Sequence, residues 1–259
     1  MSFRKHSLRI LVSNDDGIHA PGILAVVREL KKIGEVTVVA PNKQQSAVGH
    51  AITMNHPIRV AQYKLHGKFF GFAVEGTPAD CVKLAIRYLL KQKPDIVVSG
   101  INHGTNTAIS VIYSGTVSAA TEATIFGVPA IAISLATDST PDFTYASKFA
   151  KRIVKAVIEN GLPNGTLLNV NIPPISEKEI RGVKITRQGK SLWNDSFDSR
   201  RDPSDKEYFW LTGELEILDS DEDIDQIAVM NKFVSITPIH YDLTNYSALP
   251  LLKQWSVKK

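Results

Sequence analysis

Short apolar segments alternate with amphipathic helical patterns from residue 8 to residue 172, and this alternation limits the folds open to the chain. The apolar segments, rich in strand-forming residues, are 8–13, 36–40, 95–99, 128–134 and 167–172. The helical patterns between them are 21–34, 78–91, 116–126 and 143–160. Continuous apolar strands separated by helices are typical of a parallel sheet with helices on both faces. The pattern therefore predicts an α/β fold.

The alternation of strands and helices gives way to mainly strand-like patterns after Pro174. Residues 51–74 already show a hairpin-like pattern with Gly67 at its middle, and polar and apolar residues alternate through most of 175–259. Within this last part, 208–218 and 233–243 are strand-like. We expect an α/β catalytic domain over 1–175, and a β-rich extension over 176–259 that includes an arm used in oligomerisation.

Composition excludes several classes of protein. The net charge is +4, from 30 basic and 26 acidic residues, and no dense Lys/Arg block occurs, so nucleic acid is not an expected partner. No apolar run approaches the roughly 18 residues of a membrane span, and the first residues do not form a signal peptide. Cys81 is the single cysteine, which fits a reducing compartment. We expect a cytoplasmic protein without a membrane partner.

Three polar loops follow predicted strands, at 13–22, 40–50 and 99–106. The carboxyl ends of parallel strands lie at one edge of a sheet and bind ligands there. The loops bring Asp15, Asp16, Ser46 and Asn102, all with oxygen donors, to that edge. Oxygen ligands with two carboxylates suit one Mg²⁺ or Mn²⁺ ion per subunit. The alternative for the Asp15–Asp16 pair is a turn with a helix N-cap.

The segment 99–123 offers a second kind of site. It is rich in small residues and hydroxyls and then begins a helix near Gly115. Free N–H groups at a helix start bind anions, so Ser114, Gly115 and Thr116 are candidate phosphate ligands, with Asn106 donating from the side. The alternative is a plain Ser/Thr cap. At 77–80, Thr77 and Asp80 instead favour a structural capping box.

Other common site motifs are missing from the chain. No G-x-G-x-x-G follows the first strand, and the G-x-x-x-x-G-K-[ST] pattern fails because Lys184 stands where its first glycine is needed. The acidic run 219–225 has Ile224 where an EF-hand loop needs glycine. Neither a dinucleotide fingerprint nor a calcium loop is therefore expected.

Five ordered motifs resemble the SurE family: "ILVSNDDGIHAPGI", "VVAPNKQQSAVGHAIT", "VEGTPADCVKLA", "PDIVVSGINHGTN" and "YSGTVSAATEA". The later "FVSITPIHYDLT" resembles the closing motif of that family, and the resemblance is weakest from about 190 to 225. It implies a Rossmann-like domain with a C-terminal arm exchanged between subunits, in a homodimer or homotetramer. It also implies a metal-dependent 5'-nucleotidase, a phosphoric monoester hydrolase acting on nucleoside 5'-monophosphates. It leaves 3'-monophosphates and short polyphosphate open as further substrates.

The resemblance also assigns site residues. The metal ligands of the family correspond to Asp15, Asp16, Ser46 and Asn102. Its phosphate-binding residues correspond to Gly104, Asn106, Ser114, Gly115 and Thr116. Family members often carry a small residue where His103 stands. That difference removes no ligand and bears on access to the site.

The chemistry expected from these residues is hydrolysis of a phosphomonoester. Asp15 or Asp16 is the candidate catalytic group that accepts a proton from the attacking water, and the alternative is that both serve as metal ligands alone. A rival route makes an aspartate the nucleophile. Two other functions remain as alternatives, a metal-dependent nucleotide-sugar transferase and a protein that senses a nucleotide without chemistry.

Overall fold

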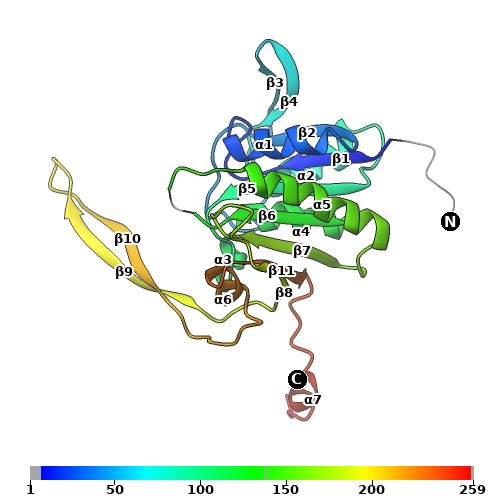
Figure 1. Ribbon diagram of the computed structural model, residues 1–259. Coiled ribbons are helices and arrows are strands. Elements are labelled where there is room, and N and C mark those ends of the chain that lie inside the picture. Colours follow the sequence, from blue (N-terminus) through cyan, green and yellow to red (C-terminus); the bar gives the residue numbers. More distant parts are fainter. Residues whose placement is uncertain (1–6, 138, 258–259) are drawn as a thin grey trace.

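The computed structural model describes residues 7–137 and 139–257, and in them nine strands form one sheet (Figure 1). The strand order is β3-β4-β2-β1-β5-β6-β7-β11-β8. The strands are β1 (Arg9–Ser13), β2 (Glu35–Pro41), β3 (Val60–Leu65), β4 (Lys68–Val74), β5 (Ile96–His103), β6 (Ala130–Leu135), β7 (Thr166–Ile172), β8 (Gly182–Ile185) and β11 (Phe233–His240). The central strands are parallel, whereas β3 runs antiparallel to β4 and β11 runs antiparallel to β7.

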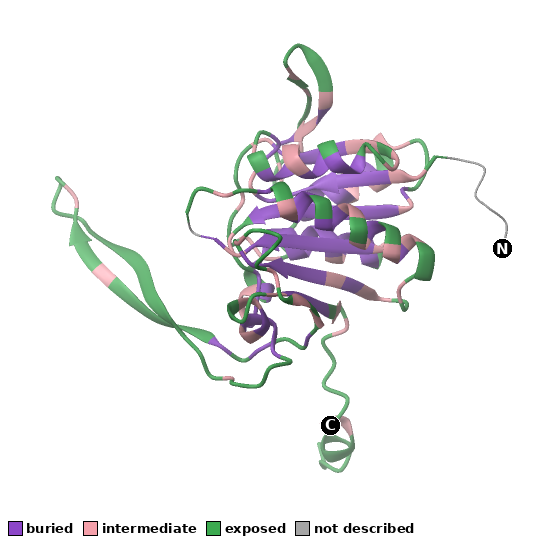
Figure 2. Ribbon diagram, in the orientation of Figure 1, coloured by how far each residue is buried: buried purple, intermediate pink, exposed green. Residues whose placement is uncertain are grey.

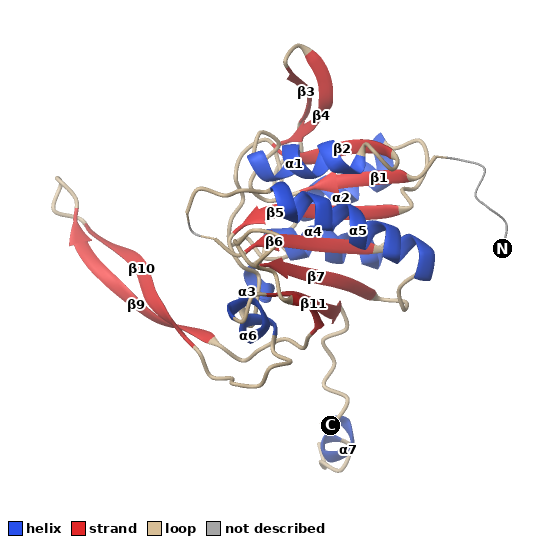
Figure 3. Ribbon diagram, viewed as in Figure 1, coloured by secondary structure: helices blue, strands red, loops and turns tan. Residues whose placement is uncertain are grey.

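Helices cover both faces of this sheet (Figure 3). One face carries α1 (Pro21–Leu30) and α5 (Thr144–Asn160), and the other carries α2 (Pro78–Leu84) and α4 (Gly115–Ile125). The remaining helical segments are η1 (Ala85–Leu89), α3 (Ser110–Tyr113), α6 (Asp225–Met230) and α7 (Leu249–Leu252). The sheet separates two apolar cores, and Cys81 lies fully buried in the core beneath α2 and α4. This arrangement confirms the predicted α/β class.

Two local features show why the helices begin where they do. Pro21 begins α1, and the following Gly22 lets the helix approach β5, because a Cβ there would lie 1.9 Å from the Ile101 carbonyl oxygen. The predicted capping box is confirmed at α2: Thr77 Oγ1 accepts from the Asp80 backbone N–H, and Asp80 Oδ2 accepts from the Thr77 N–H. Asp80 is therefore a structural residue.

Some predicted boundaries were wrong. The helix expected over 78–91 ends at Leu89, after a π-helical turn, because Leu90 is already extended as the chain turns toward β5. The strand expected over 95–99 continues as β5 to His103, so it carries Asn102 within the sheet. The other main elements lie within a few residues of their predicted ranges.

The extension both completes the sheet and leaves it. Strands β8 and β11 bond to the sheet beside β7, whereas β9 (Leu192–Arg201) and β10 (Glu207–Glu216) pair only with each other. This hairpin projects away from the body and is exposed along nearly its whole length (Figures 1 and 2). It confirms a C-terminal β-arm, although β9 was not predicted. Within the described residues no helix is long and apolar enough to cross a membrane.

Candidate active site

The three polar loops meet at one end of the sheet, as predicted. Strand β1 pairs in parallel with β2 on one side and β5 on the other, so the loops that follow these strands share one edge. The backbone N–H of Gln45 donates to the Asp15 carbonyl oxygen over 2.7 Å, which ties the second loop to the first. A cavity of about 790 Å³ opens at this edge, and its lining includes Asp15, Ser46 and Asn102.

Asp15 is a buried carboxylate, only 5% exposed. Its Oδ1 accepts a hydrogen bond from Thr116 Oγ1 over 2.5 Å, which ties the end of β1 to the start of α4. Burial raises the pKa of Asp15 to about 6; the Thr116 hydroxyl opposes this rise and the neighbouring charge of Asp16 adds to it. The ionised form of Asp15 is therefore destabilised by burial, and a bound cation would stabilise it.

Asp16 is less buried and is held by the third loop. Its Oδ2 accepts from the backbone N–H of His103 over 3.2 Å. Burial raises the pKa of Asp16 as well, and the His103 N–H limits the rise. The His103 ring turns to another partner, with Nε2 placed 2.9 Å from the Ser139 carbonyl oxygen. His103 therefore positions Asp16 through its backbone.

Ser46 and Asn102 supply neutral oxygens. Ser46 is exposed, and its Oγ accepts from Gln44 Nε2 over 2.8 Å. Asn102 is nearly buried and uses its Nδ2 to donate to the Gly104 carbonyl oxygen over 2.9 Å, which leaves Oδ1 as the ligand atom. No group of three or more His, Cys, Asp or Glu side chains in the described part of the chain could hold a metal ion. The candidate centre thus depends on hydroxyl and amide oxygens beside two carboxylates, a donor set that fits Mg²⁺ or Mn²⁺.

Three of the five candidate phosphate residues line the same cavity, whereas Gly115 and Thr116 follow Ser114 at the start of α4 and are not part of the lining. The three are Gly104, Asn106 and Ser114. Ser114 is also the N-cap of α4, since its Oγ accepts from the Val117 N–H over 3.0 Å. Gly115 allows α4 to begin against the carboxylate, because a Cβ there would lie 2.8 Å from Asp15 Cβ.

The side chains of two more of these residues already have partners. Asn106 Nδ2 donates to Ser134 Oγ over 2.8 Å, and the Thr116 hydroxyl holds Asp15. Asn106 keeps a second amide proton, and it forms part of a buried polar cluster with Asn169 and Asn171, whose amides donate to its carbonyl oxygen. The cluster holds this loop at the carboxyl ends of β6 and β7.

Two charged residues near the site were missed by sequence reasoning. Asp225, at the start of α6 and fully buried, accepts from the backbone N–H groups of Ala108 and Gly189. Glu122 on α4 pairs with His50, at the end of the Ser46 loop, over 2.8 Å. Sequence reasoning gave neither residue a role, because each acts on a segment distant along the chain.

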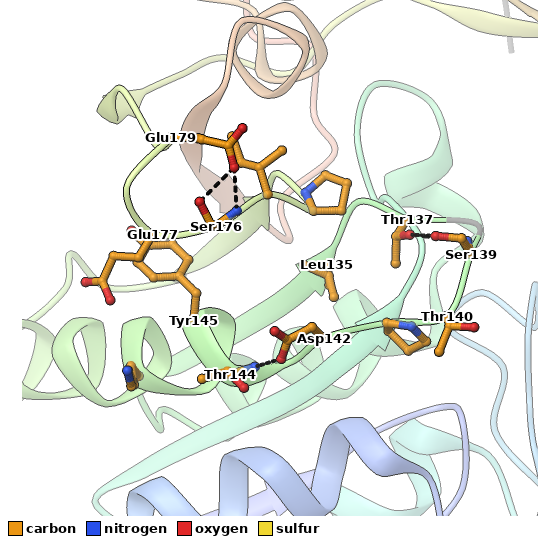
Figure 4. A pocket seen from close by; sticks show the side chains of 14 residues that line it. Leu135, Thr137, Ser139, Thr140, Asp142, Thr144, Tyr145, Ser176, Glu177 and Glu179 are labelled. Atoms are coloured by element: carbon orange, nitrogen blue, oxygen red, sulfur yellow. Dashed lines mark hydrogen bonds between the residues drawn. The ribbon is translucent and has the colours of Figure 1, made fainter.

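A second cavity, of about 470 Å³, lies beside the first at the ends of β6 and β7 (Figure 4). Its polar groups are largely engaged with one another: Asp142 Oδ1 accepts from the Thr144 N–H that begins α5, and Glu179 accepts from Ser176. Asp142, Glu177 and Glu179 outnumber Lys148 in its lining and give it a negative character. A phosphate is therefore disfavoured here, and the first cavity is the candidate active site.

The comparisons with known proteins identify the family of the chain. The family model "Survival protein SurE" matches residues 10–195. The chain belongs to the SurE family. A SurE relative named "5'-nucleotidase SurE" from Chlorobium chlorochromatii is 49% identical over 250 residues, covering 96% of this chain and 92% of the relative. One from Flavobacterium psychrophilum with the same name is 46% identical, covering 96% and 98%.

A solved structure resembles this one closely. The crystal structure of the SurE protein from Aquifex aeolicus has a TM-score of 0.82 and 41% identity, covering 95% of this chain and 98% of that one. The predicted family and fold class are thereby confirmed. The family model includes all three loops that form the edge of the cavity.

Proposed function

We propose that the protein is a metal-dependent phosphomonoester hydrolase that acts on nucleoside 5'-monophosphates. The observation that carries the proposal is the buried Asp15, which shares one cavity with Ser46 and Asn102 from two other loops. The names of the SurE relatives support the substrate class. The nucleotide-sugar transferase alternative has no support among them.

The residues present fit one Mg²⁺ or Mn²⁺ ion per subunit, held by Asp15, Asp16, Ser46 and Asn102. Such an ion, when bound, polarises a phosphoryl oxygen and neutralises the charge that develops on it. The chain's own groups bind and orient the ester. Gly104, Asn106 and the α4 start at Ser114–Thr116 hold the remaining phosphoryl oxygens.

Asp15 and Asp16 are the proposed catalytic residues as well as ligands. One of them accepts the proton of the attacking water, and Asp16 is the better placed because it is the less buried of the two. The rival route makes an aspartate the nucleophile, with a phosphoryl-aspartate that water then cleaves. Trapping of a phosphorylated chain after denaturation in acid distinguishes the two routes.

The decisive experiment measures phosphate release from a panel of monophosphates, with added Mn²⁺ or Mg²⁺ and with EDTA. Asp15→Ala and Asp16→Ala should each lower the rate by at least ~10³, and Asn102→Ala by less, because water can replace one neutral ligand. Asp142→Ala is the matched control, since that carboxylate lies in the second cavity. Near wild-type turnover in either site variant would refute the assignment, and nucleotide binding without turnover would favour the sensing alternative.

We include in this proposal a homodimer or homotetramer in which the β9–β10 arm is exchanged. Phe197, Phe209 and Trp210 on the arm are each more than half exposed, which is more apolar surface than an isolated hairpin usually leaves open. Replacing 205–220 with a short Gly/Ser bridge should yield a monomer by light scattering. A deletion protein that stays dimeric, folded and fully active would show that the arm is not needed for assembly.

A cytoplasmic location completes the proposal. It is supported by the single buried thiol, which forms no disulfide within the chain.

A further inference from the structure

The candidate active-site cavity has two chemically different ends. The polar end is the candidate metal and phosphate site described above. The other end is mainly apolar: Ile109, Tyr113, Leu192, Trp193 and Leu211 line it, together with Asp195, Thr212 and Gly213 of the arm. Leu192 and Trp193 belong to the base of the β9–β10 arm, and Leu211 lies midway along β10. A volume of about 790 Å³ falls within the range of small-molecule sites and leaves room beyond a phosphate.

The apolar end is fixed to the polar end by buried hydrogen bonds. Asp225 Oδ2 accepts from the Ala108 N–H over 2.9 Å, and its Oδ1 accepts from the Gly189 N–H over 3.0 Å. Gln188 Nε2 donates to the Ala108 carbonyl oxygen over 2.8 Å. The loop that carries Asn106 and the segment that leads into β9 are thus held together by one buried carboxylate. The position of Trp193 relative to the phosphate site is therefore set within the chain.

Two aromatic rings at this end, those of Trp193 and Tyr113, are only partly covered, and the indole of Trp193 is the larger. Trp193 is 47% exposed, although it lines a cavity. An indole offers a flat apolar face, and stacking of a base on such a face contributes about 1–3 kcal/mol per base without selecting one base strongly. A group bonded to the phosphate at the polar end would extend toward this wall.

We propose that Trp193 is a specificity-determining residue, which stacks on the nucleobase while the polar end binds the phosphate. The inference rests on the proposed function and names the part of the substrate that the apolar wall recognises. It predicts preference for nucleotides over base-free phosphate esters and weak discrimination among the bases.

The test compares AMP with ribose 5-phosphate, which carries a phosphate ester but no base, in the presence of Mn²⁺. Trp193→Ala should lower kcat/KM for AMP by about 5- to 150-fold, mainly through KM, which is the kinetic equivalent of lost stacking. Ribose 5-phosphate should change by less than about twofold, and Trp193→Phe should restore most of the AMP activity. The matched control is Trp210→Ala, because Trp210 is on β10 outside the cavity lining and is similarly exposed.

Equal losses on AMP and ribose 5-phosphate, or no loss on AMP, would overturn the stacking role. The stacking role would also be overturned if Trp193→Ala, but not Trp210→Ala, changed the mass measured by light scattering, because the ring would then form a subunit contact. Calorimetry with AMP and Mn²⁺ separates the two proposals. If the wild type binds AMP without hydrolysis and Trp193→Ala binds it more weakly, only the proposed function fails. Equal binding by both proteins refutes the stacking.

Discussion

Asp15→Asn should make the metal-free protein more stable while it removes activity. Burial raises the pKa of Asp15 from 3.8 to about 6, which corresponds to about 3 kcal/mol at about 1.4 kcal/mol per unit. The neutral amide avoids this penalty and still accepts from Thr116, but its own N–H groups lack an assured partner. We therefore expect a net gain of about 1–2 kcal/mol in the free energy of unfolding near neutral pH.

The stability difference between Asp15→Asn and the wild type should depend on pH in a direction set by the pKa shift of Asp15. Because the folded pKa is the higher one, the folded metal-free wild type holds a proton on Asp15 that the unfolded chain has lost. Its stability therefore falls as pH rises from about 4 to about 6, and then levels off. The advantage of Asp15→Asn should grow by about 1 kcal/mol between about pH 5 and about pH 8.

Urea unfolding of both proteins in EDTA measures this difference, and the other titrating groups are shared and largely cancel. A variant that is no more stable than the wild type at any pH in this range would refute the reasoning. With Mn²⁺ present the order should reverse, because only the wild type gains stability from the ion.

Two further substitutions test packing and charge. Gly115→Ala places a Cβ 2.8 Å from Asp15 Cβ, so it should destabilise the protein by about 1–3 kcal/mol and weaken Mn²⁺ binding; unchanged Mn²⁺ affinity by calorimetry would contradict this. Lys151 and Lys32 hold the pKa of Glu29 at about 2, below its usual 4.5. This carboxylate therefore stabilises the fold when the pH is above 4.5, and the stabilisation is lost as the pH falls toward 2. Glu29→Gln should cost about 1–2 kcal/mol at pH 7, after allowance for the partly exposed lysines, and clearly less at pH 3 in urea titrations; an equal loss at both pH values would count against the ion pairs.

The sheet and the set of candidate ligands were predictable because both follow from local patterns. Each central strand is a continuous apolar run that precedes a polar loop, and parallel pairing then brings Asp15, Ser46 and Asn102 to one edge regardless of loop length. The start of α4 was predictable for a similar reason, since Ser114 and Gly115 are a local helix-start signal.

The outer part of the cavity was not predictable. Strand β9 carries charged and polar residues at most of its positions, so its sequence has no alternation that marks a strand. Asp225 and Gln188 tie the segment before Trp193 to the loop at Ala108, and a buried carboxylate of this kind has no sequence signature. The Thr116 bond to Asp15 is equally non-local, joining residues 101 positions apart.

The complete burial of Cys81 has a practical consequence for labelling. Burial raises the pKa of this thiol well above its usual range, so maleimide reagents have neither access to it nor a thiolate to attack. A cysteine introduced at the exposed Ser204, in the turn between β9 and β10, would be the single reactive thiol in an otherwise unaltered chain. Spin labels at that position would give a distance between arms in solution, and that distance tests the proposed exchange of the arm between subunits.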